Sequence, residues 1–247
     1  MDGPPVCAIA DVHGRADLLD ALLNAIEARL PGARVVMLGD VIDRGPYVPA
    51  ALDLVRDVPA RFPGSHVLLG NHENWLLEAT GGNWDAWEQW RMWGGRSTLA
   101  GFDIDADLAP ASMREAFEER VPGLLEFLRT RPRRWHGEGA AEGCLFVHAG
   151  VDPAVPIDAQ DERDLIWIRE PFLSWPHPLE LHVVHGHTID EAGPVERVHR
   201  TGLDTGAYRT GRLSALVLES DGSRRFMLAE GERGARPIVR ERVSDRV

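Results

Sequence analysis

Five short apolar runs occur along the chain, and each is followed at once by a cluster of polar residues and glycine. The runs are VCAIA, RVVML, HVLL, CLFV and LHVV, and they begin at Val6, Arg34, His66, Cys144 and Leu181. Runs this short and this rich in valine, leucine and isoleucine are typical of strands that are covered on both faces. We therefore expect the polar clusters to lie at strand ends.

Helical patterns separate the first three runs. Residues 16–30 carry apolar side chains at 18, 19, 22, 23 and 26 before Pro31-Gly32 ends the pattern, and residues 47–58 form a second helix candidate. Strand and helix alternate here, which favours an α/β sandwich. Near the end of the chain, 213–229 reads as a β-hairpin around a polar turn, and the charged residues after it are expected to be loose.

The segment from about 74 to 137 has helix-like patterns and no convincing strand, so it is interpreted as a helical, cap-like insertion in a single domain spanning 1–247. Four tryptophans recur in it every third residue, from Trp84 to Trp93, and span about 180° of a helix. Such a helix either packs between the core and its neighbours, or forms a lid whose indoles line a substrate groove. In the second case Gly94-Gly95 would act as the hinge.

Composition narrows the class of protein. The chain has 247 residues, and 44% of them are hydrophobic, enough for a substantial core. No long uncharged apolar stretch predicts a membrane helix, and the N-terminus has no basic region of a signal peptide, so a cytoplasmic location is expected. The two cysteines, Cys7 and Cys144, lie inside apolar runs and are expected to be buried free thiols in a reducing compartment.

The chain carries a net charge of −12, and all of its 27 basic residues are arginine. Adding the four positive charges of two divalent ions would still leave −8, which disfavours nucleic acid as a partner. Any group that grips a phosphate must therefore be a guanidinium. No feature of the sequence indicates an oligomer, and a monomer is expected.

The polar residues at the strand ends are of metal-binding types. Asp11 and His13 lie two apart, so both side chains leave one strand tip on the same face. Asp40, after the next strand, can reach the same ion and bridge to a second one. Further ligand candidates are an amide oxygen at Asn71 and imidazoles at His148 and His187. Mixed nitrogen and oxygen ligands suit manganese, iron or zinc, and two such ions can polarise a phosphoryl group and activate water.

Each motif alone is weak, but five occur in order, each directly after a strand. DVHG, GDVIDRG, GNHE, HAG and GHT resemble the ordered signature of bacterial and phage-type phosphoprotein phosphatases (the PPP family), within the calcineurin-like metallophosphoesterase superfamily. The resemblance runs from residue 7 to about 218. It implies a four-layer αββα sandwich and two divalent metal ions, with manganese expected first and iron, zinc, cobalt or nickel as alternatives.

The resemblance also implies a role for each matched residue. The first metal would be held by Asp11, His13 and Asp40, and the second by Asp40, Asn71, His148 and His187. His72 corresponds to the general acid and Asp43 to its carboxylate partner. The phosphate would be gripped by Arg44 and Arg169, with Asn71 and Tyr208 as further substrate contacts.

Some assignments stay open at this point. His185 lies two residues before His187 on the same strand face, so either could be the last metal ligand, with the other as its neighbour. Asp204, like Tyr208, either lines the site or belongs to a structural turn. Glu73 lies near the metals by sequence alone and could orient backbone groups.

The resemblance favours a serine/threonine protein phosphatase, with tyrosine as a further target, acting on a phosphoprotein or a phosphorylated small molecule. The alternative is a symmetrical dinucleoside polyphosphate hydrolase, such as a diadenosine tetraphosphatase. That branch resembles GDLVARG and GHW, whereas GDVIDRG and GHT are intact here, so the phosphatase is preferred. A phosphodiesterase or nuclease is disfavoured by the acidic charge, and a non-catalytic phospho-ligand binder by the complete set of site residues.

Overall fold

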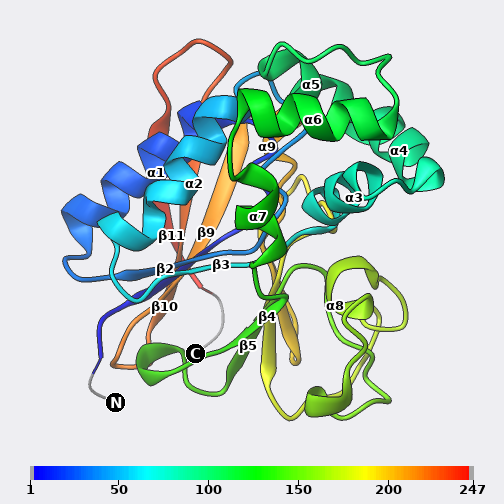
Figure 1. The fold of residues 1–247 in the computed structure, drawn as a ribbon. Helices are drawn as coiled ribbons and strands as arrows, with labels where there is room; N and C mark the ends of the chain where they lie inside the picture. Colours follow the sequence, from blue (N-terminus) through cyan, green and yellow to red (C-terminus); the bar gives the residue numbers. More distant parts are fainter. Residues whose placement is uncertain (1–2, 245–247) are drawn as a thin grey trace.

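Two mixed β-sheets form the centre of the molecule in the computed structural model, which describes residues 3–244 (Figure 1). The first sheet has the order β11-β10-β9-β1-β2-β3 and the second β4-β5-β6-β8-β7. The first sheet consists of β1 (Val6–Ile9), β2 (Arg34–Met37), β3 (His66–Val67), β9 (Arg212–Leu218), β10 (Arg224–Glu230) and β11 (Ile238–Val243). The second consists of β4 (Arg134–His136), β5 (Cys144–Val147), β6 (His182–His185), β7 (Val195–Glu196) and β8 (Arg200–Gly202).

Side chains of β1 divide between two cores, as the period of two of a strand requires. Val6 and Ala8 face the second sheet and pack with Phe146 and Val184 in the core between the sheets. Their neighbours on the strand face the other way, into the core under the helices. Because both faces of β1 are buried, its sequence is apolar throughout and does not alternate.

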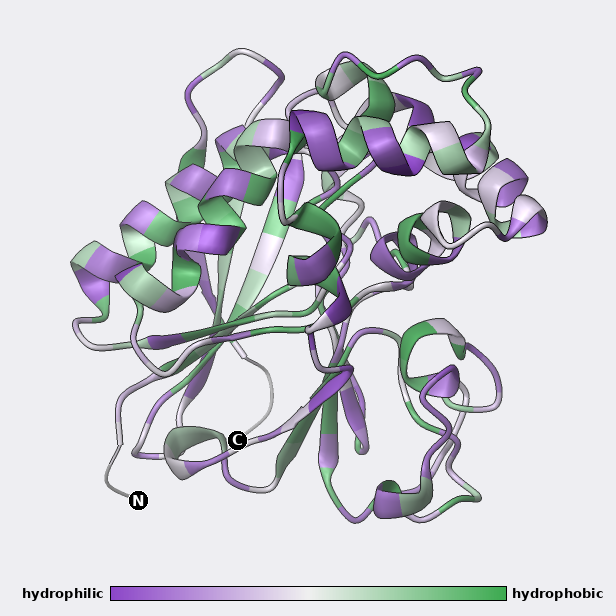
Figure 2. Ribbon diagram, in the orientation of Figure 1, coloured by the Kyte–Doolittle hydropathy of each residue, from purple (hydrophilic) through white to green (hydrophobic). Residues whose placement is uncertain are grey.

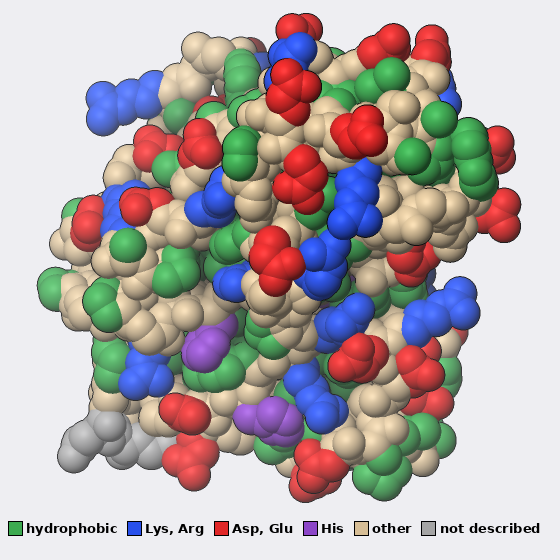
Figure 3. Space-filling model, viewed as in Figure 1, with side chains coloured by type: hydrophobic (Ala, Val, Ile, Leu, Met, Phe, Trp, Pro, Cys, Tyr) green, Lys and Arg blue, Asp and Glu red, His purple; other side chains and the backbone are tan. Residues whose placement is uncertain are grey.

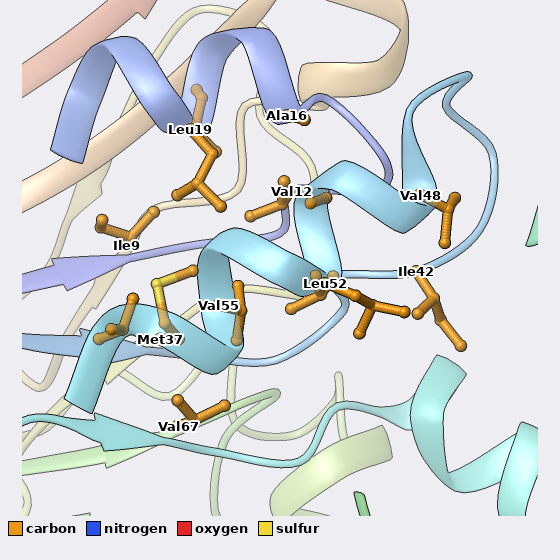
Figure 4. Close-up of a cluster of buried hydrophobic side chains, with 14 of the residues drawn as sticks. Ile9, Val12, Ala16, Leu19, Met37, Ile42, Val48, Leu52, Val55 and Val67 are labelled. Atoms are coloured by element: carbon orange, nitrogen blue, oxygen red, sulfur yellow. The ribbon is translucent and has the colours of Figure 1, made fainter. Parts of the chain in front are cut away.

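Helices α1 (Ala16–Arg29) and α2 (Val48–Arg61) cover the outer face of the first sheet (Figure 1). Their apolar sides face the strands, and their polar sides face outward (Figure 2). In Figure 4, Leu19 of α1 and Val55 of α2 lie over Ile9 and Met37 of the sheet. The outer face of the second sheet packs on a third core, which includes α8 (Asp164–Trp167) and Phe172. The predicted four-layer α/β sandwich is therefore confirmed.

The helical insertion is also present. Within 74–137 it comprises the later turns of α3 (Asn71–Thr80), then α4 (Trp84–Trp90), the π-helical turn η1 (Arg91–Gly95), α5 (Arg96–Gly101), α6 (Pro110–Arg120) and α7 (Leu124–Arg129). The expectation of no strand between 74 and 137 is wrong, because β4 lies there and pairs with β5. Its three residues are too few to show a period, and it is held by packing of Trp135 on Phe146 across the pair.

The C-terminal residues differ from expectation as well. The hairpin predicted at 213–229 is formed by β9 and β10, but the chain then returns as β11, antiparallel to β10 at the sheet edge. All but one of its residues are exposed, as is usual for an edge strand. Its charged sequence lacks the apolar alternation of a half-buried strand, and for that reason it was predicted to be loose. Cys7 and Cys144 are both buried, as expected. Among the described residues, no helix is long and apolar enough to span a membrane. Arginine and carboxylate side chains are interspersed over the face shown in Figure 3.

Candidate metal centre and active site

The five polar clusters meet where the strands of the two sheets end. Within 3–244, six residues other than glycine have a left-handed backbone, and five of these belong to the clusters, the sixth being Asp103. The five are His13, Asp40, Asp43, Arg44 and His187, with φ between 43° and 73°. A side chain makes this conformation costly, so it persists only where the surroundings impose it, most often at functional sites. The sharp turns aim several side chains from one strand end at the same point.

Glu73 holds the turn after β2 in this conformation. Its carboxylate is buried and accepts hydrogen bonds from the backbone N–H groups of Asp40 (2.8 Å), Val41 (2.8 Å) and Ile42 (3.1 Å). A fourth bond comes from Gly70 (3.1 Å) at the start of α3. Burial, and next the charge of Asp40, raises the pKa of Glu73 above its ordinary value. Glu73 is thus the positioning group for the turn that carries Asp40.

One group of donor atoms surrounds Asn71. Its side-chain oxygen lies 2.8 Å from Nε2 of His148 and 2.9 Å from Nδ1 of His187. Asp40 completes the group, with Oδ2 3.4 Å from Nε2 of His148. The ligand atoms of Asp40, His148 and His187 lie within 4.8 Å of one another, and all three residues are buried. These four residues are the set predicted for the second metal.

A second group shares Asp40 and contains His13 and His72, whose ligand atoms also lie within 4.8 Å of one another. Nε2 of His13 is 3.6 Å from Oδ2 of Asp40, and Nδ1 of His13 is held by the carbonyl of Ile42 at 2.7 Å. Asp11 is adjacent, but both of its oxygens accept from the backbone N–H of His187 at 3.1 Å. The structure thus places Asp40 between the two groups, as a bridging ligand requires.

The structure separates His185 from His187. His185 is buried, but its Nδ1 faces the carbonyl of Gly186 and its Nε2 faces Arg200 (3.2 Å), away from the donor atoms. Burial, and next the charge of Arg200, lowers the pKa of His185 to about 3. It is therefore a neutral neighbour of the turn, and His187 is the histidine that reaches Asn71.

The buried carboxylates of the site repel one another, and a nearby cation would relieve this repulsion. Burial, and next the charge of Asp204, raises the pKa of Asp11 well above its usual range. Burial also raises the pKa of Asp204 to about 6, with a further contribution from Asp40. For Asp40 burial acts in the same direction, but the charge of His148 and then that of His72 outweigh it and hold the pKa well below normal.

These residues fit divalent metal ions. Buried carboxylates that raise one another's pKa gain stability from a cation beside them. Nε2 of His187 is buried and has no hydrogen-bond partner among the described residues. An amide oxygen, carboxylates and imidazoles together form the mixed donor set that Mn²⁺, Fe²⁺ or Zn²⁺ accepts. His and Asp side chains are thus positioned for a metal centre.

Metal binding is expected to release protons at pH 7.5. Burial disfavours a charged His148, but the charge of Asp40 beside it outweighs burial and raises the pKa of His148 to about 10. In the metal-free folded chain this imidazole is therefore protonated at any pH below about 10, whereas a metal ligand must be neutral. Titrating Mn²⁺ calorimetrically in two buffers of different ionisation enthalpy should show net release. Equal heats in both buffers would contradict the ion pair.

Behind this centre, Asp43 fixes the orientation of His72. Its Oδ2 lies 2.6 Å from Nδ1 of His72 and accepts the indole N–H of Trp90 at 2.8 Å. Thr98 binds the same residue twice, donating its hydroxyl to Oδ1 and accepting the backbone N–H of Asp43. Trp90 and Thr98 belong to the insertion and are fully buried. Sequence reasoning missed both, since only the fold brings them to Asp43.

Arg44 is held on the cavity side by the same insertion. Its Nη atoms lie 2.9 Å from Nε2 of His13 and 2.9 Å from Nε2 of His72. Its Nε donates to the carbonyl of Trp93, and its backbone N–H donates to that of Gly94, both at 3.3 Å. Gly94 has φ 134°, and a Cβ there would lie 2.7 Å from Cγ of Arg44. This glycine serves close packing against the arginine.

The cavity over the donor atoms has a volume of about 280 Å³. Six of the predicted site residues line this cavity, namely Asp40, Arg44, Asn71, His72, Arg169 and His187. The rest of the lining consists of the indoles of Trp75, Trp93 and Trp167. Of the four regularly spaced tryptophans, Trp87 and Trp90 are buried and Trp84 lies outside this lining, so only Trp93 is at the site. Trp75 and Trp167 were not singled out from the sequence.

Tyr208 contacts two residues of the site. Its ring stands 4.9 Å from the guanidinium of Arg44 and 5.5 Å from the ring of His13. It lines a separate, larger cavity of about 890 Å³. That cavity contains five arginines, namely Arg15, Arg209, Arg212, Arg233 and Arg240. Tyr208 thus stands between two cavities.

A four-layer αββα sandwich with clustered Asp, Asn and His side chains at its strand ends, beside two arginines, defines a metal-dependent phosphoesterase. The model of the calcineurin-like phosphoesterase family matches residues 4–200 of the chain, and the chain belongs to this family.

The relatives that match in sequence are named symmetrical bis(5'-nucleosyl)-tetraphosphatases. The chain is 33% identical over 146 residues to a symmetrical bis(5'-nucleosyl)-tetraphosphatase of Janthinobacterium sp. (strain Marseille), covering 59% of this chain and 43% of the relative. It is 31% identical over 155 residues to the enzyme of the same name from Paracidovorax citrulli, covering 63% and 47%. The chain therefore covers less than half of the length of these relatives.

Solved structures share the fold. One that is provisionally named a diadenosine tetraphosphatase superposes with a TM-score of 0.63 at 23% identity, covering 94% of this chain and 95% of that one. The cold-active protein-tyrosine phosphatase of a Shewanella species superposes with a TM-score of 0.60 at 17% identity, covering 93% and 78%.

The interpretation as a protein phosphatase is wrong, because the relatives that match in sequence are named for dinucleoside tetraphosphate hydrolysis. It rested on GDVIDRG and GHT. The arginine and histidine of those turns are predicted to bind phosphate and metal, which both reactions use. These residues carry no information about the group attached to the phosphate, which is what separates the two substrates.

Proposed function

We propose that the chain is a symmetrical dinucleoside polyphosphate hydrolase, which cleaves a dinucleoside tetraphosphate at its central bridging oxygen into two nucleoside diphosphates. The observation that carries the proposal is the identity of 31–33% with enzymes of that name over about 60% of the chain. The site supports it, because the donor atoms adjoin two arginines that face a cavity. Guanidinium groups are the natural clamp for consecutive phosphates.

The proposal assigns the donor atoms to two divalent ions, of which Mn²⁺ is the first candidate. Asp11, His13 and Asp40 would hold one, and Asp40, Asn71, His148 and His187 the other. When bound, such ions polarise a phosphoryl oxygen and lower the pKa of a water, which supplies the nucleophile.

The remaining steps belong to the chain's own side chains. Arg44 and Arg169 bind the oxygens of the phosphoryl group, where negative charge spreads as the reaction proceeds. The oxygen of water bonds to one central phosphorus, and the bond from that phosphorus to the bridging oxygen breaks. His72 donates a proton to the leaving oxygen, and Asp43, 2.6 Å from Nδ1, holds the imidazole in position for the transfer.

The arginine-lined cavity beyond Tyr208 is assigned to the far half of the substrate. A dinucleoside tetraphosphate extends on both sides of its reacting phosphorus, so its enzyme needs room on both sides. Here one cavity contains the donor atoms, and the second adjoins it across Tyr208, which contacts Arg44. Arg233 in this second cavity donates one N–H to the carbonyl of Tyr208 at 3.0 Å, and its remaining N–H groups are assigned to a phosphate.

Metal-stripped protein restored with Mn²⁺ is expected to convert diadenosine tetraphosphate to ADP alone, and faster than it releases phosphate from a serine phosphopeptide. Chromatography of the nucleotides, beside phosphate release from the peptide, measures both reactions. A mixture of ATP and AMP, or a preference for the phosphopeptide, would refute the proposal. Restoring iron, zinc, cobalt or nickel separately on the same substrates identifies the preferred ion.

A further inference from the structure

Three indole rings occupy the wall of a small, strongly polar cavity. Trp75 and Trp167 are half-buried, and Trp93 exposes 53% of its surface. The rest of the lining is a carboxylate, two arginines, an asparagine and two histidines. Large aromatic surface left uncovered among charged groups is unusual in a soluble protein, and it marks a site that takes a ring-bearing ligand.

The local structure explains why these rings face the reacting groups. Trp75 follows His72 by three residues and Asn71 by four on α3, so the three side chains share one face of the helix. The ring of Trp75 stands 5.3 Å from that of His72, edge to face.

Trp167 reaches the same place from α8. It ends α8, and the extended residue Ile168 after it packs on the core beneath. Because side chains alternate along an extended chain, Trp167 and Arg169 both face the cavity. The rings of Trp167 and Trp75 are 4.6 Å apart, and that of Trp167 lies 6.2 Å from His187.

We propose that Trp75, Trp93 and Trp167 form a stacking site for a nucleobase of the substrate whose phosphates Arg44 and Arg169 bind. This inference rests on the proposed function and names the part of the substrate that the cavity recognises. Stacking on indoles holds a planar base without reading its edges, and a neighbouring guanidinium adds cation–π attraction. The ribose and one phosphate of a nucleoside diphosphate then link the stacked base to the phosphoryl group beside His72.

The occupant is a base because of what surrounds the rings. An aliphatic chain would be buried against the rings but could neither stack on them nor interact through a π face with the two guanidinium groups beside them. A peptide side chain would not explain three rings from three separate segments of the chain. Each base stacked on an aromatic side chain contributes roughly 5- to 150-fold in affinity.

The test uses the Mn²⁺-loaded protein and two substrates, diadenosine tetraphosphate and inorganic tripolyphosphate, which has no base. Trp75→Leu and Trp167→Leu are each expected to raise KM for the dinucleotide roughly 5- to 150-fold. Hydrolysis of tripolyphosphate should change less than about twofold, because its contacts to arginine and metal remain. Trp75→Phe and Trp167→Phe should restore most of the loss, since a ring is retained.

Trp84→Leu is the matched control, because Trp84 is 59% exposed and lies outside the cavity lining. This variant should show the wild-type KM and kcat on both substrates. An unchanged KM for the dinucleotide in the Trp75 and Trp167 variants overturns the stacking site. So does an equal loss on both substrates, which would show a structural role for the rings.

A binding measurement separates this inference from the proposed function. In calorimetric titrations, ADP should bind the wild-type protein roughly 5- to 150-fold more tightly than inorganic pyrophosphate, and the leucine variants should lose that difference. This result would support the stacking site even if diadenosine tetraphosphate were not hydrolysed. Equal affinity for ADP and pyrophosphate would overturn it even if hydrolysis occurred.

Discussion

His72→Asn is expected to lower kcat by about 10²- to 10⁴-fold, the range that a positioned proton donor contributes. Nδ1 of His72 is held by Asp43 at 2.6 Å, and its Nε2 lies 2.9 Å from a guanidinium nitrogen of Arg44, which also lines the cavity. Asparagine keeps a polar group in the buried space but cannot deliver a proton to the leaving oxygen. Steady-state kinetics on diadenosine tetraphosphate gives the loss of rate, and elemental analysis gives the metal content, which should stay at the wild-type value.

The metal content distinguishes a proton donor from a metal ligand at this position. The second role is possible in geometry because the ligand atoms of His72, His13 and Asp40 lie within 4.8 Å of one another. A variant that loses metal along with activity would make His72 a ligand and remove it as the acid. His177→Asn is the matched control, since His177 is exposed and lies outside the cavity lining. It should leave kcat and metal content unchanged.

Glu73→Gln is expected to lower the free energy of unfolding by roughly 2–6 kcal/mol. The carboxylate accepts four backbone N–H bonds, two at each oxygen, and an amide retains only one of those oxygens. Two buried N–H donors then face an NH₂ group, and each unsatisfied donor costs about 1–3 kcal/mol. Urea unfolding of the metal-free protein measures the change without a contribution from bound ions.

Glu78→Gln controls for the loss of a charge on the same helix, because Glu78 is exposed on α3. Its effect should stay within about 0.5 kcal/mol, as is usual for a surface substitution. The Glu73 variant should also bind Mn²⁺ more weakly, since the turn that carries Asp40 loses its anchor. A Glu73 variant as stable as the Glu78 variant would show that the turn after β2 keeps its conformation without the Glu73 carboxylate.

Much of the fold follows from periodicity in the sequence. The strands before the polar clusters are buried on both faces and therefore read as unbroken apolar runs, and α1 and α2 show a clear helical period. β4 and β11 escaped notice because three residues show no period and because an exposed edge strand has charged side chains. Both are defined by the strand they pair with, which lies elsewhere in the chain.

The donor set was also predictable, since each ligand candidate directly follows a strand and parallel strands end at one edge of a sheet. The supporting residues were not. Glu73 sits three residues into α3, where a capping role is a local signal, yet it chiefly serves the backbone of residues 40–42. Trp75 of α3 and Trp167 of α8 are in contact although more than ninety residues separate them, and no local pattern predicts that contact.

The two halves of the site are anchored in different parts of the molecule. The donor atoms that fit metal ions rest on the ends of the two sheets, whereas Asp43 and Arg44 are held by Trp90, Thr98 and the backbone around Gly94. Substitutions can therefore change metal affinity and turnover independently of each other. A change in the insertion can retune proton delivery and phosphate binding while the ion-holding frame stays as it is, which leaves one half of the machinery free to diverge between relatives.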